Sequence, residues 1–234
     1  MKVPLFRLFK TEKRRLAVAL GSNFMLSGFS YIPQVWALSY LTNNIGLAAV
    51  IALTVNTIIL VVGAIAVPMF GTLGDRVGRR RLFLCATTFG IVWTVPMFML
   101  IDTHNPIIIT LALVICFVFA VGASYASQAA FLAELFPPAI RYSGVAFARE
   151  VSGAILGGTA PLLATALFAW SGHWWPIAVF MIFNAVVATI AVYFSKYFRS
   201  DADQFNDQEY THDSTGSLRT VQSRTDRNRE KVLG

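Results

Sequence analysis

Residues 71–82 read GTLGDRVGRRRL and lie between two long apolar segments of the chain. Gly71, Gly74 and Gly78 permit a tight reversal of the backbone and a close approach of two helices. Asp75 is a single carboxylate among four arginines, well placed to pair with them or with a helix N-terminus. A loop that only retains positive charge at one membrane surface would need the arginines, but neither the glycines nor Asp75. The stretch therefore predicts a specialised connection between two membrane helices.

The composition of the whole chain is that of a protein dissolved largely in lipid. Of the 234 residues, 56% are hydrophobic and only 13% are charged, whereas an ordinary soluble domain has about 25% charged residues. The 13 Lys and Arg against 5 Asp and Glu in residues 1–198 give that part its net positive charge, while residues 199–234 hold 6 against 7. This distribution excludes a soluble fold for residues 16–198.

The apolar segments predict an all-α membrane protein with six spans, because a spanning helix needs about 20 mostly apolar residues. No charged residue occurs between Leu16 and Gly74, which is room for two spans with a break at residues 42–46. We expect the spans at Leu16–Leu41, Leu47–Phe70, Leu82–Ile101, Ile107–Phe131, Gly144–Ala169 and Trp174–Ser195. A basic loop, Gly71–Arg81, connects the second span to the third.

The positions of Lys and Arg predict the orientation of the spans. Basic residues precede the first span, fill the second-to-third loop, continue in the fourth-to-fifth loop and follow the sixth span. The alternate loops, 42–46, 102–106 and 170–173, have none. By the positive-inside rule both termini lie in the cytoplasm. The chain then divides into a basic cytoplasmic segment (1–15), a six-span transmembrane domain (16–198) and a cytoplasmic tail (199–234), whose polar composition predicts disorder.

Aromatic residues gather near the predicted outer ends of the spans. Trp36, Tyr40, Trp170, Trp174 and Trp175 all fall there. Such a distribution is typical of the aromatic belt at a membrane interface. The alternative is that these bulky side chains simply fill helix surfaces.

Several functional classes have no support in the sequence. The basic residues form short loops rather than one face, so nucleic acid is not an expected partner. His104, His173 and His212 lie in turns or in the tail, and Cys85 and Cys116 lie in apolar stretches, with no spacing typical of a metal site. We find no catalytic arrangement and no phosphate-binding loop. We therefore expect no enzyme activity, no cofactor and no metal, and coupling to an ion gradient rather than to ATP.

The stretch 71–82 resembles the signature loop of the major facilitator superfamily, in which Gly-x-Leu-x-Asp-Arg-x-Gly-Arg-Arg links the second and third helices of each half. The matching residues are Gly71, Leu73, Asp75, Arg76, Gly78, Arg79 and Arg80. The match is ungapped. The resemblance covers nearly all of residues 1–198, but only as the C-terminal half, the last six helices, of the family's fold. It implies a missing N-terminal six-span half as a partner.

The fourth-to-fifth loop carries a second resemblance. Residues 134–141 read ELFPPAIR and are followed by Tyr142, Ser143 and Gly144. This segment is similar to the one after the tenth helix of the metabolite:proton symporter family and its sugar-porter relatives. The resemblance implies a charge network at the cytoplasmic gate, formed by Asp75, Arg79, Glu134 and Arg141. Plain anchoring of the topology is the alternative role for these charges.

Polar residues inside the spans are the candidates for a substrate cavity. Arg149 and Glu150 are the ionisable pair at membrane depth, where such groups are functional candidates by default; for Arg149 a structural or interfacial role is the alternative. One face of the first span presents Asn23, Ser27, Ser30, Tyr31 and Gln34, and the fourth span adds Ser124, Ser127 and Gln128. These faces line either a cavity or a contact between helices. Gly153 and Gly157, before Pro161, allow another helix to approach the fifth span closely.

The sequence as a whole favours a secondary active transporter or half of one. The resemblance implies proton-coupled symport of a small metabolite, such as an organic acid, by alternating access in a bacterial inner membrane. Its partners would be membrane lipid, the substrate and the proton. Two alternatives stay open: a stand-alone six-span carrier or pore that homodimerises, and a non-transporting truncated remnant or membrane scaffold.

Overall fold

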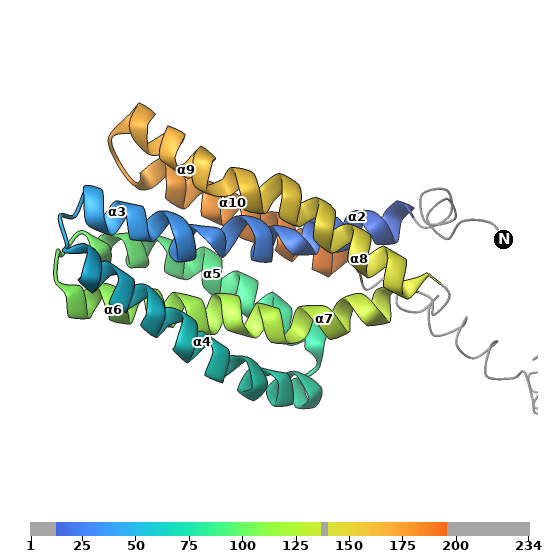
Figure 1. Cartoon of the computed structure of the whole chain (residues 1–234). Helices are drawn as coiled ribbons and strands as arrows, with labels where there is room; N and C mark the ends of the chain where they lie inside the picture. The colour runs from blue at the N-terminus through green and yellow to red at the C-terminus, as the bar shows by residue number, and fades with distance from the viewer. Residues whose placement is uncertain (1–12, 137–139, 196–234) are drawn as a thin grey trace, which may run out of the picture.

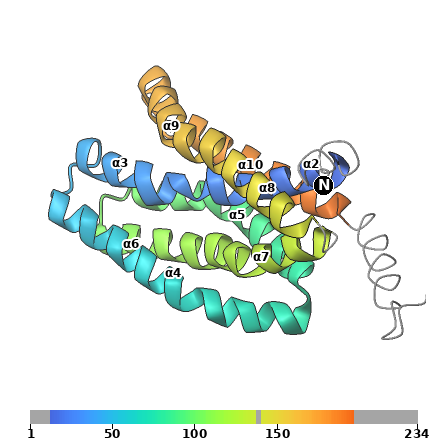
Figure 2. The same cartoon turned by 45° about the vertical axis from the view of Figure 1, so that its right-hand side comes forward.

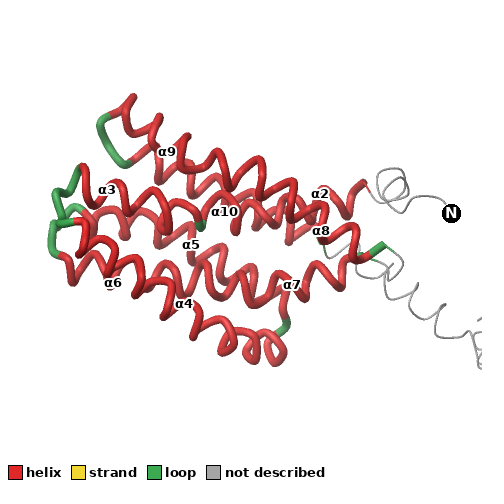
Figure 3. The backbone as a smooth tube through the Cα atoms, in the orientation of Figure 1, coloured by secondary structure: helices red, strands yellow, loops and turns green. Residues whose placement is uncertain are grey.

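The computed structural model describes residues 13–136 and 140–195 of the chain. Regular structure in these two ranges is helical, as the tube in Figure 3 shows. When each continuous helical run is counted as one helix, six helices in the described residues are long and apolar enough to cross a membrane. They confirm the predicted all-α fold and its six spans. The predicted segment 1–15, apart from residues 13–15, and the predicted tail 199–234 lie outside the described residues.

Three spans are single helices and three are composite. The second, third and sixth spans are α4 (Ala49–Val77), α5 (Arg79–Ile101) and α10 (Trp175–Phe194). The first span consists of α2 (Lys13–Asn23), η1 (Phe24–Phe29), η2 (Ile32–Trp36) and α3 (Ala37–Asn43). The fourth consists of α6 (Pro106–Ile115), η3 (Cys116–Gly122) and α7 (Ala123–Leu135). The fifth consists of α8 (Arg141–Ser152), η4 (Gly153–Gly157) and α9 (Gly158–Ser171).

The η elements are π-helical turns, and two of them have a cause in the sequence. η1 ends at Phe29 and η4 ends at Gly157, each four residues before a proline, Pro33 or Pro161. Proline lacks the N–H that would bond to the carbonyl four residues back. Local π-helical adjustment is one way in which a membrane helix satisfies the backbone groups that are freed. The composite spans also carry the predicted cavity residues.

The spans run antiparallel to their neighbours in sequence and form one bundle (Figure 1). The α4–α5 connection lies at the same end as the start of α2 and the turn between α7 and α8; we call this the arginine end. The connections from α3 to α4, from α5 to α6 and from α9 to α10 lie at the opposite end. This alternation places the arginine-rich stretch and Lys13 at one end, as the charge pattern predicts. That this end is cytoplasmic stays a prediction.

The predicted loop Gly71–Arg81 is wrong in its extent. α4 continues through residues 71–77, α5 begins at Arg79, and Gly78 alone separates the two helices. Gly78 has φ 100° and ψ 125°, a conformation that favours glycine, and its N–H bonds to the carbonyl oxygen of Gly74 at 2.9 Å. Gly71 and Gly74 remain within the helix and have no positive φ, so the reversal is confined to Gly78 and is tighter than the glycine pattern suggests. The fourth span likewise runs on to Leu135 rather than ending at Phe131.

The core lies where α5, α10 and the first span pack together. Phe29, Phe83 and Phe98 are fully buried there. Gly21 on α2 lets Ala191 of α10 approach, since a Cβ at Gly21 would lie 2.6 Å from the methyl group of Ala191. In Figure 2, α5 and α10 lie behind the first span, while α4, α7 and α8 lie on the near side. The second and fifth spans are the least covered by the rest of the bundle.

Candidate functional site

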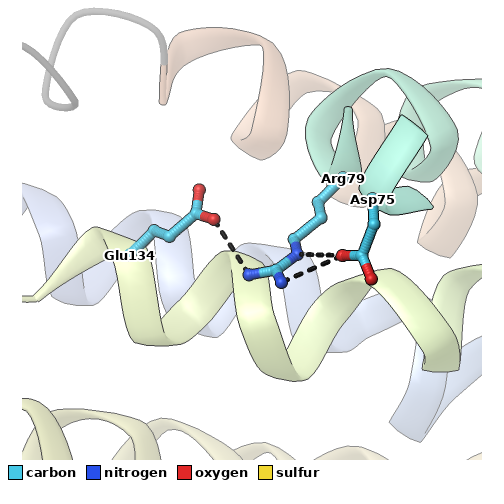
Figure 4. Close-up of polar contacts among 3 residues, drawn as sticks. All are labelled: Asp75, Arg79 and Glu134. Atoms are coloured by element: carbon cyan, nitrogen blue, oxygen red, sulfur yellow. Dashed lines mark hydrogen bonds and ion pairs between the residues drawn. The ribbon is translucent and has the colours of Figure 1, made fainter. Parts of the chain in front are cut away.

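Arg79 links two carboxylates at the arginine end (Figure 4). Its Nε and Nη2 donate to Oδ1 of Asp75 over 3.2 and 3.0 Å, and its Nη1 donates to Oε1 of Glu134 over 3.0 Å. Asp75 belongs to the last turn of α4, Arg79 begins α5, and Glu134 is in the last turn of α7. The guanidinium fork therefore holds three helix ends together through one side chain.

The three charges are partly exposed and lie at unfavourable helix ends. Their side chains are 63% (Asp75), 38% (Arg79) and 39% (Glu134) accessible, so each pair contributes at most about 1 kcal/mol. A helix N-terminus favours an anion and a C-terminus favours a cation. Here the acids sit at the C-terminal ends of α4 and α7, and the arginine sits at the N-terminal end of α5. The pairing therefore compensates charges that their own helices destabilise.

The other residues of the signature stretch lie near this network but take no part in its three hydrogen bonds. Arg80 donates to the carbonyl oxygens of Val192 (3.1 Å) and Tyr193 (2.8 Å) at the end of α10. Arg76 and Leu73 are exposed. Gly71 has open space where a Cβ would be, and a Cβ at Gly74 would lie 3.2 Å from Leu82. A small hollow opens beside the network, lined by Arg80, Phe131, Glu134, Leu135 and Ser195.

Arg141 takes a different partner from the one that the resemblance implies. Within the described residues, its Nε donates to the carbonyl oxygen of Phe136 over 3.3 Å rather than to Asp75 or Glu134. The structure thus joins three of the four predicted network residues directly. Arg141 instead fastens the start of α8 to the end of the fourth span.

The predicted cavity residues fall into two sets, and the first is buried between helices. Gln128 Nε2 donates to Oδ1 of Asn23 over 3.1 Å, and both side chains are almost inaccessible, at 4% and 1%. Ser27 is also buried, and Gln34 Nε2 donates to the carbonyl oxygen of Ser30 over 3.0 Å. Asn23 and Gln128 form the interhelical hydrogen bond that was the alternative to cavity lining.

The second set is exposed in the described part of the chain. Tyr31, Arg149 and Glu150 belong to it. The phenol of Tyr31 lies against the backbone of Gly157, where a Cβ would meet Cζ at 3.2 Å. The predicted close approach at Gly157 is therefore made by a tyrosine side chain from the first span. Tyr125 on α7 is another exposed polar side chain of the fourth span. It was missed by the sequence reasoning, although it lies three residues from Gln128 on the polar part of the fourth span.

At the opposite end, the role of Asp102 as a shared hydrogen-bond acceptor was also missed. Asp102 accepts hydrogen bonds from the hydroxyl of Tyr40 (3.5 Å) and from Nε1 of Trp174 (2.6 Å). Trp36 and Tyr40 are buried and stacked, with ring centroids 4.8 Å apart, so these two are core residues. Trp170 and Trp175 are exposed, as residues of an aromatic belt would be. The clustering of aromatic residues near one end was the signal in the sequence.

No group of three or more His, Cys, Asp or Glu that could hold a metal ion occurs in residues 13–136 and 140–195. Arg79, Asp75 and Glu134 form an ionic site at the arginine end, and Tyr31, Tyr125 and Arg149 are exposed polar side chains of three different spans.

Comparison with known proteins agrees with the geometry. The family model described as Major Facilitator Superfamily matches residues 18–224. A shikimate transporter of Escherichia coli K12 is 26% identical over 167 residues, which cover 71% of this chain and 38% of that protein. An ectoine/proline transporter of Corynebacterium glutamicum is 32% identical over 70% of this chain and 32% of its own length. An alpha-ketoglutarate permease of Escherichia coli K12 is 29% identical over 67% of this chain and 36% of its own length. The chain thus spans well under half the length of these relatives.

Proposed function

Because the chain belongs to the major facilitator superfamily, we propose that it acts as one half of a secondary transporter, which moves a small metabolite across the membrane by alternating access. The curated relatives are named as transporters, of shikimate, of ectoine and proline, or of alpha-ketoglutarate, and none of these names describes an enzyme. Transporters of this fold bind substrate near the bilayer midplane, between two six-span halves. The six spans of this chain supply one wall of such a site.

The observation that carries the proposal is the double contact of Arg79 with Asp75 and Glu134. It fixes the ends of α4, α5 and α7 relative to one another, so it can hold the arginine end of this half in the arrangement that closes against the second half. Each ion pair is partly exposed and therefore weak, which allows the contacts to be made and broken within one transport cycle. Together the two ion pairs favour the closed state of the arginine end without making the open state inaccessible.

The exposed spans supply the surface for the second half. α4 and the fifth span are the least covered by the rest of the bundle, and Asp75 uses only Oδ1 in its bonds to Arg79. Its second oxygen is free of Arg79 (Figure 4) and can accept from a helix N-terminus of the missing half. The arginine end lies in the cytoplasm by the positive-inside rule. In this proposal both termini are cytoplasmic and the membrane is the bacterial inner membrane.

We further propose proton-coupled symport of an organic acid. Arg149 is an exposed cation at membrane depth and can attract an anionic substrate. Glu150 is the acidic residue of the same stretch and is the candidate proton carrier within this half. The two residues are adjacent, so their side chains point about 100° apart and can serve different partners.

The test compares Glu134→Gln with wild type in cells that express the complete gene product. Uptake of radiolabelled shikimate, proline and alpha-ketoglutarate is measured with and without an imposed inward proton gradient. A cysteine introduced at Leu135, beside the hollow, reports access from the arginine side through its maleimide labelling rate. We expect Glu134→Gln to raise the labelling rate several-fold and to lower uptake, because Arg79 loses one of its two partners.

The matched control is Arg81→Gln, which removes a neighbouring exposed charge without touching the network. If Glu134→Gln behaves like Arg81→Gln in both assays, the gate role is wrong. If none of the three labelled compounds is accumulated under any gradient, the proposed substrate classes are wrong. The wider transport proposal would then give way to a scaffold or remnant.

A further inference from the structure

The middle of the fifth span combines several causes of helix bending in one short stretch. The π-helical turn η4 is followed directly by Gly158, and Pro161 lies near the start of α9. Pro161 lacks the N–H that would bond to the carbonyl oxygen four residues back. Thr159 donates its hydroxyl to the carbonyl oxygen of Ile155, a type of bond that often bends helices. Helices kink at prolines, glycines and π-turns of this kind, so residues 153–161 form a natural hinge.

The surroundings of this hinge leave it room to bend. Gly153 and Gly158 have nothing within 4 Å of the position of a Cβ, and the fifth span is the least buried of the six. The first span also combines a π-helical turn, η1, with a proline. There, however, a Cβ at Gly28 would lie 1.9 Å from Oδ1 of Asn184, so α10 occupies the space into which that helix could bend. Of the two breaks, the one in the fifth span is therefore the one that can act as a joint.

The helix beyond the hinge, α9, is packed through small side chains. Its fully buried residues are Ala160 and Ala164, which contribute one methyl group each. The free energy of burial is roughly proportional to the apolar area removed from water, and a methyl group has little. In both views of the cartoon, α9 inclines away from α3 toward its C-terminal end, whereas α8 lies close to α2 (Figures 1 and 2). The alanines alone therefore hold α9 only weakly against the first span.

An aromatic ring strengthens this contact near the end of α9 that is farthest from the hinge. Phe168 meets Tyr40 edge-on, with ring centroids 5.3 Å apart and 79° between the planes, and it meets Trp36 at 6.1 Å. It lies on the same face of α9 as the two buried alanines, which precede it at intervals of four residues. Trp36 and Tyr40 are themselves fixed, because they stack on each other and Tyr40 donates to Asp102. We call the contact of Phe168 with these two rings the latch.

A small movement at the hinge is enough to open the latch. Phe168 lies seven residues beyond Pro161, about 10 Å along the helix at 1.5 Å per residue. A change of about 20° in the bend, the size of an ordinary helix kink, would move Phe168 by roughly 4 Å. Aromatic pairs are favourable up to centroid separations of about 7 Å, so this movement would break the contact with Tyr40.

We propose that α9 is a gate helix at the end opposite the arginines, with residues 153–161 as its hinge and the contact of Phe168 with Trp36 and Tyr40 as its latch. When the latch opens, α9 moves away from the first span and the bundle opens between the two. This inference rests on the proposed transport function and deepens it, since it identifies a moving element within this half. The two ends of the bundle then have separate gates, an ionic network at one and an aromatic latch at the other.

Distances between spin labels test the movement in the purified full chain in detergent micelles. Cys85, which is exposed, is first replaced by serine. Two label pairs then join α4 to the fifth span, one at each end of the bundle, at residues that are all exposed: Val50→Cys with Ala169→Cys, and Val77→Cys with Tyr142→Cys as the reference. We expect double electron–electron resonance to give two populations of distances for the first pair and one for the reference pair.

Replacement of Phe168 tests the latch. We expect Phe168→Ala to raise the ratio of the longer to the shorter distance by at least about 5-fold, because two ring contacts are lost. Phe168→Leu keeps most of the apolar volume and removes the ring, so it should act in the same direction and decides the case if Phe168→Ala does not fold. Phe183→Ala is the matched control, since Phe183 is exposed on α10, and we expect it to leave the ratio unchanged.

Stiffening of the fifth span tests the hinge. Gly153 and Gly158 have helical dihedral angles and open space for a Cβ, so alanine fits at both places and restricts the backbone to the conformation seen here. We expect the double variant Gly153→Ala, Gly158→Ala to lower the ratio of the longer to the shorter distance several-fold. Thr88→Ala is the control, because it also favours a helix, at an exposed place on α5, and its ratio should match wild type.

Two results would overturn the gate. One is a single narrow distance between Val50 and Ala169 in both wild type and Phe168→Ala, and the other is a double glycine variant that behaves like Thr88→Ala. The transport function is tested separately by uptake in the complete gene product. Wild-type uptake in the double glycine variant removes the gate and leaves transport standing. The expected changes in distance, in a protein that accumulates no solute, leave the moving helix and remove the transport function.

Discussion

Trp174 donates its indole N–H to Oδ2 of Asp102 over 2.6 Å, and this bond ties the residue before α10 to the residue after α5. The ring of Trp174 also stacks on Phe98, with centroids 5.3 Å apart and an angle of 3° between the planes. Tyr40 donates to the other oxygen of Asp102 from the first span. The first, third and sixth spans are thus fastened at the end opposite the arginines.

Replacing Trp174 by Phe tests this fastening. The phenyl ring keeps an aromatic contact with Phe98 but cannot donate to Asp102. We expect the free energy of unfolding to fall by about 1 kcal/mol, the net value of one hydrogen bond, which corresponds to about 2–4 °C in thermal unfolding. Tryptophan fluorescence of the protein in micelles measures the change. Trp170→Phe is the matched control, since Trp170 is 77% exposed, and an equal loss in both variants would contradict the role of the bond.

We expect replacement of Arg80 to lower the stability of the protein more than replacement of its neighbour Arg81. Its guanidinium bonds to the carbonyl oxygens of Val192 and Tyr193 at the C-terminal end of α10, where a cation is favoured. We expect Arg80→Gln to lower the free energy of unfolding by about 1 kcal/mol. Arg81→Gln should change it by less than about 0.5 kcal/mol, as exposed substitutions usually do. Thermal unfolding of the two variants under the same conditions measures this difference. Equal stabilities would show that the Arg80 contacts contribute nothing.

The contact between Gly28 and Asn184 predicts that a substitution at Asn184 can suppress the effect of a substitution at Gly28. A Cβ at Gly28 would lie 1.9 Å from Oδ1 of Asn184, a buried oxygen that accepts no hydrogen bond within the described part of the chain. We expect Gly28→Ala to cost about 1–3 kcal/mol of stability, as overpacking does. Asn184→Ala should restore most of this loss, because it removes the atom that clashes. Gly158→Ala, which meets nothing within 4 Å, is the control, and a double variant no more stable than Gly28→Ala would contradict the packing.

The bond between Asn23 and Gln128 is suited to a double-mutant cycle. Both side chains are buried, one on the first span and one on the fourth. We expect a coupling energy of about 0.6 kcal/mol between Asn23→Ala and Gln128→Ala, the average for hydrogen bonds between membrane helices. Unfolding of the two single variants and the double variant measures it. Additive losses, with no coupling, would mean that the bond does not form in the folded protein.

Much of the fold could be predicted from residues 16–198, because lipid allows few solutions for an apolar chain. The absence of charge from Leu16 to Gly74 and the placing of arginines in alternate loops give the number and order of the spans. The ends of helices were less predictable. Residues 71–77 have glycines and a carboxylate that suit a loop equally well, yet they continue α4, since only Gly78 takes a conformation that ends it.

The candidate site was predictable where residues act within one motif, and less so where distant spans meet. The contact of Arg79 with Asp75 follows from a spacing of four, and that with Glu134 came from a family resemblance. Polar spacing cannot distinguish Asn23, which is buried against Gln128, from Tyr31, which is exposed. That difference depends on how the first span is rotated against the fourth and the fifth.

The two ends of the bundle are held by different kinds of contact, and ionic strength acts on them unequally. The network of Arg79 consists of exposed ion pairs, which dissolved salt screens over a Debye length of about 8 Å at physiological concentration. The cluster around Trp174 and Phe98 has no ion pair within the described residues and combines stacked rings with hydrogen bonds to Asp102, and excluded salts such as sulfate strengthen the burial of apolar surface. A rising salt concentration therefore weakens the contacts at the arginine end more than those at the aromatic end. In the proposed transport cycle, the medium on one side of the membrane would in this way shift the balance between the two open states.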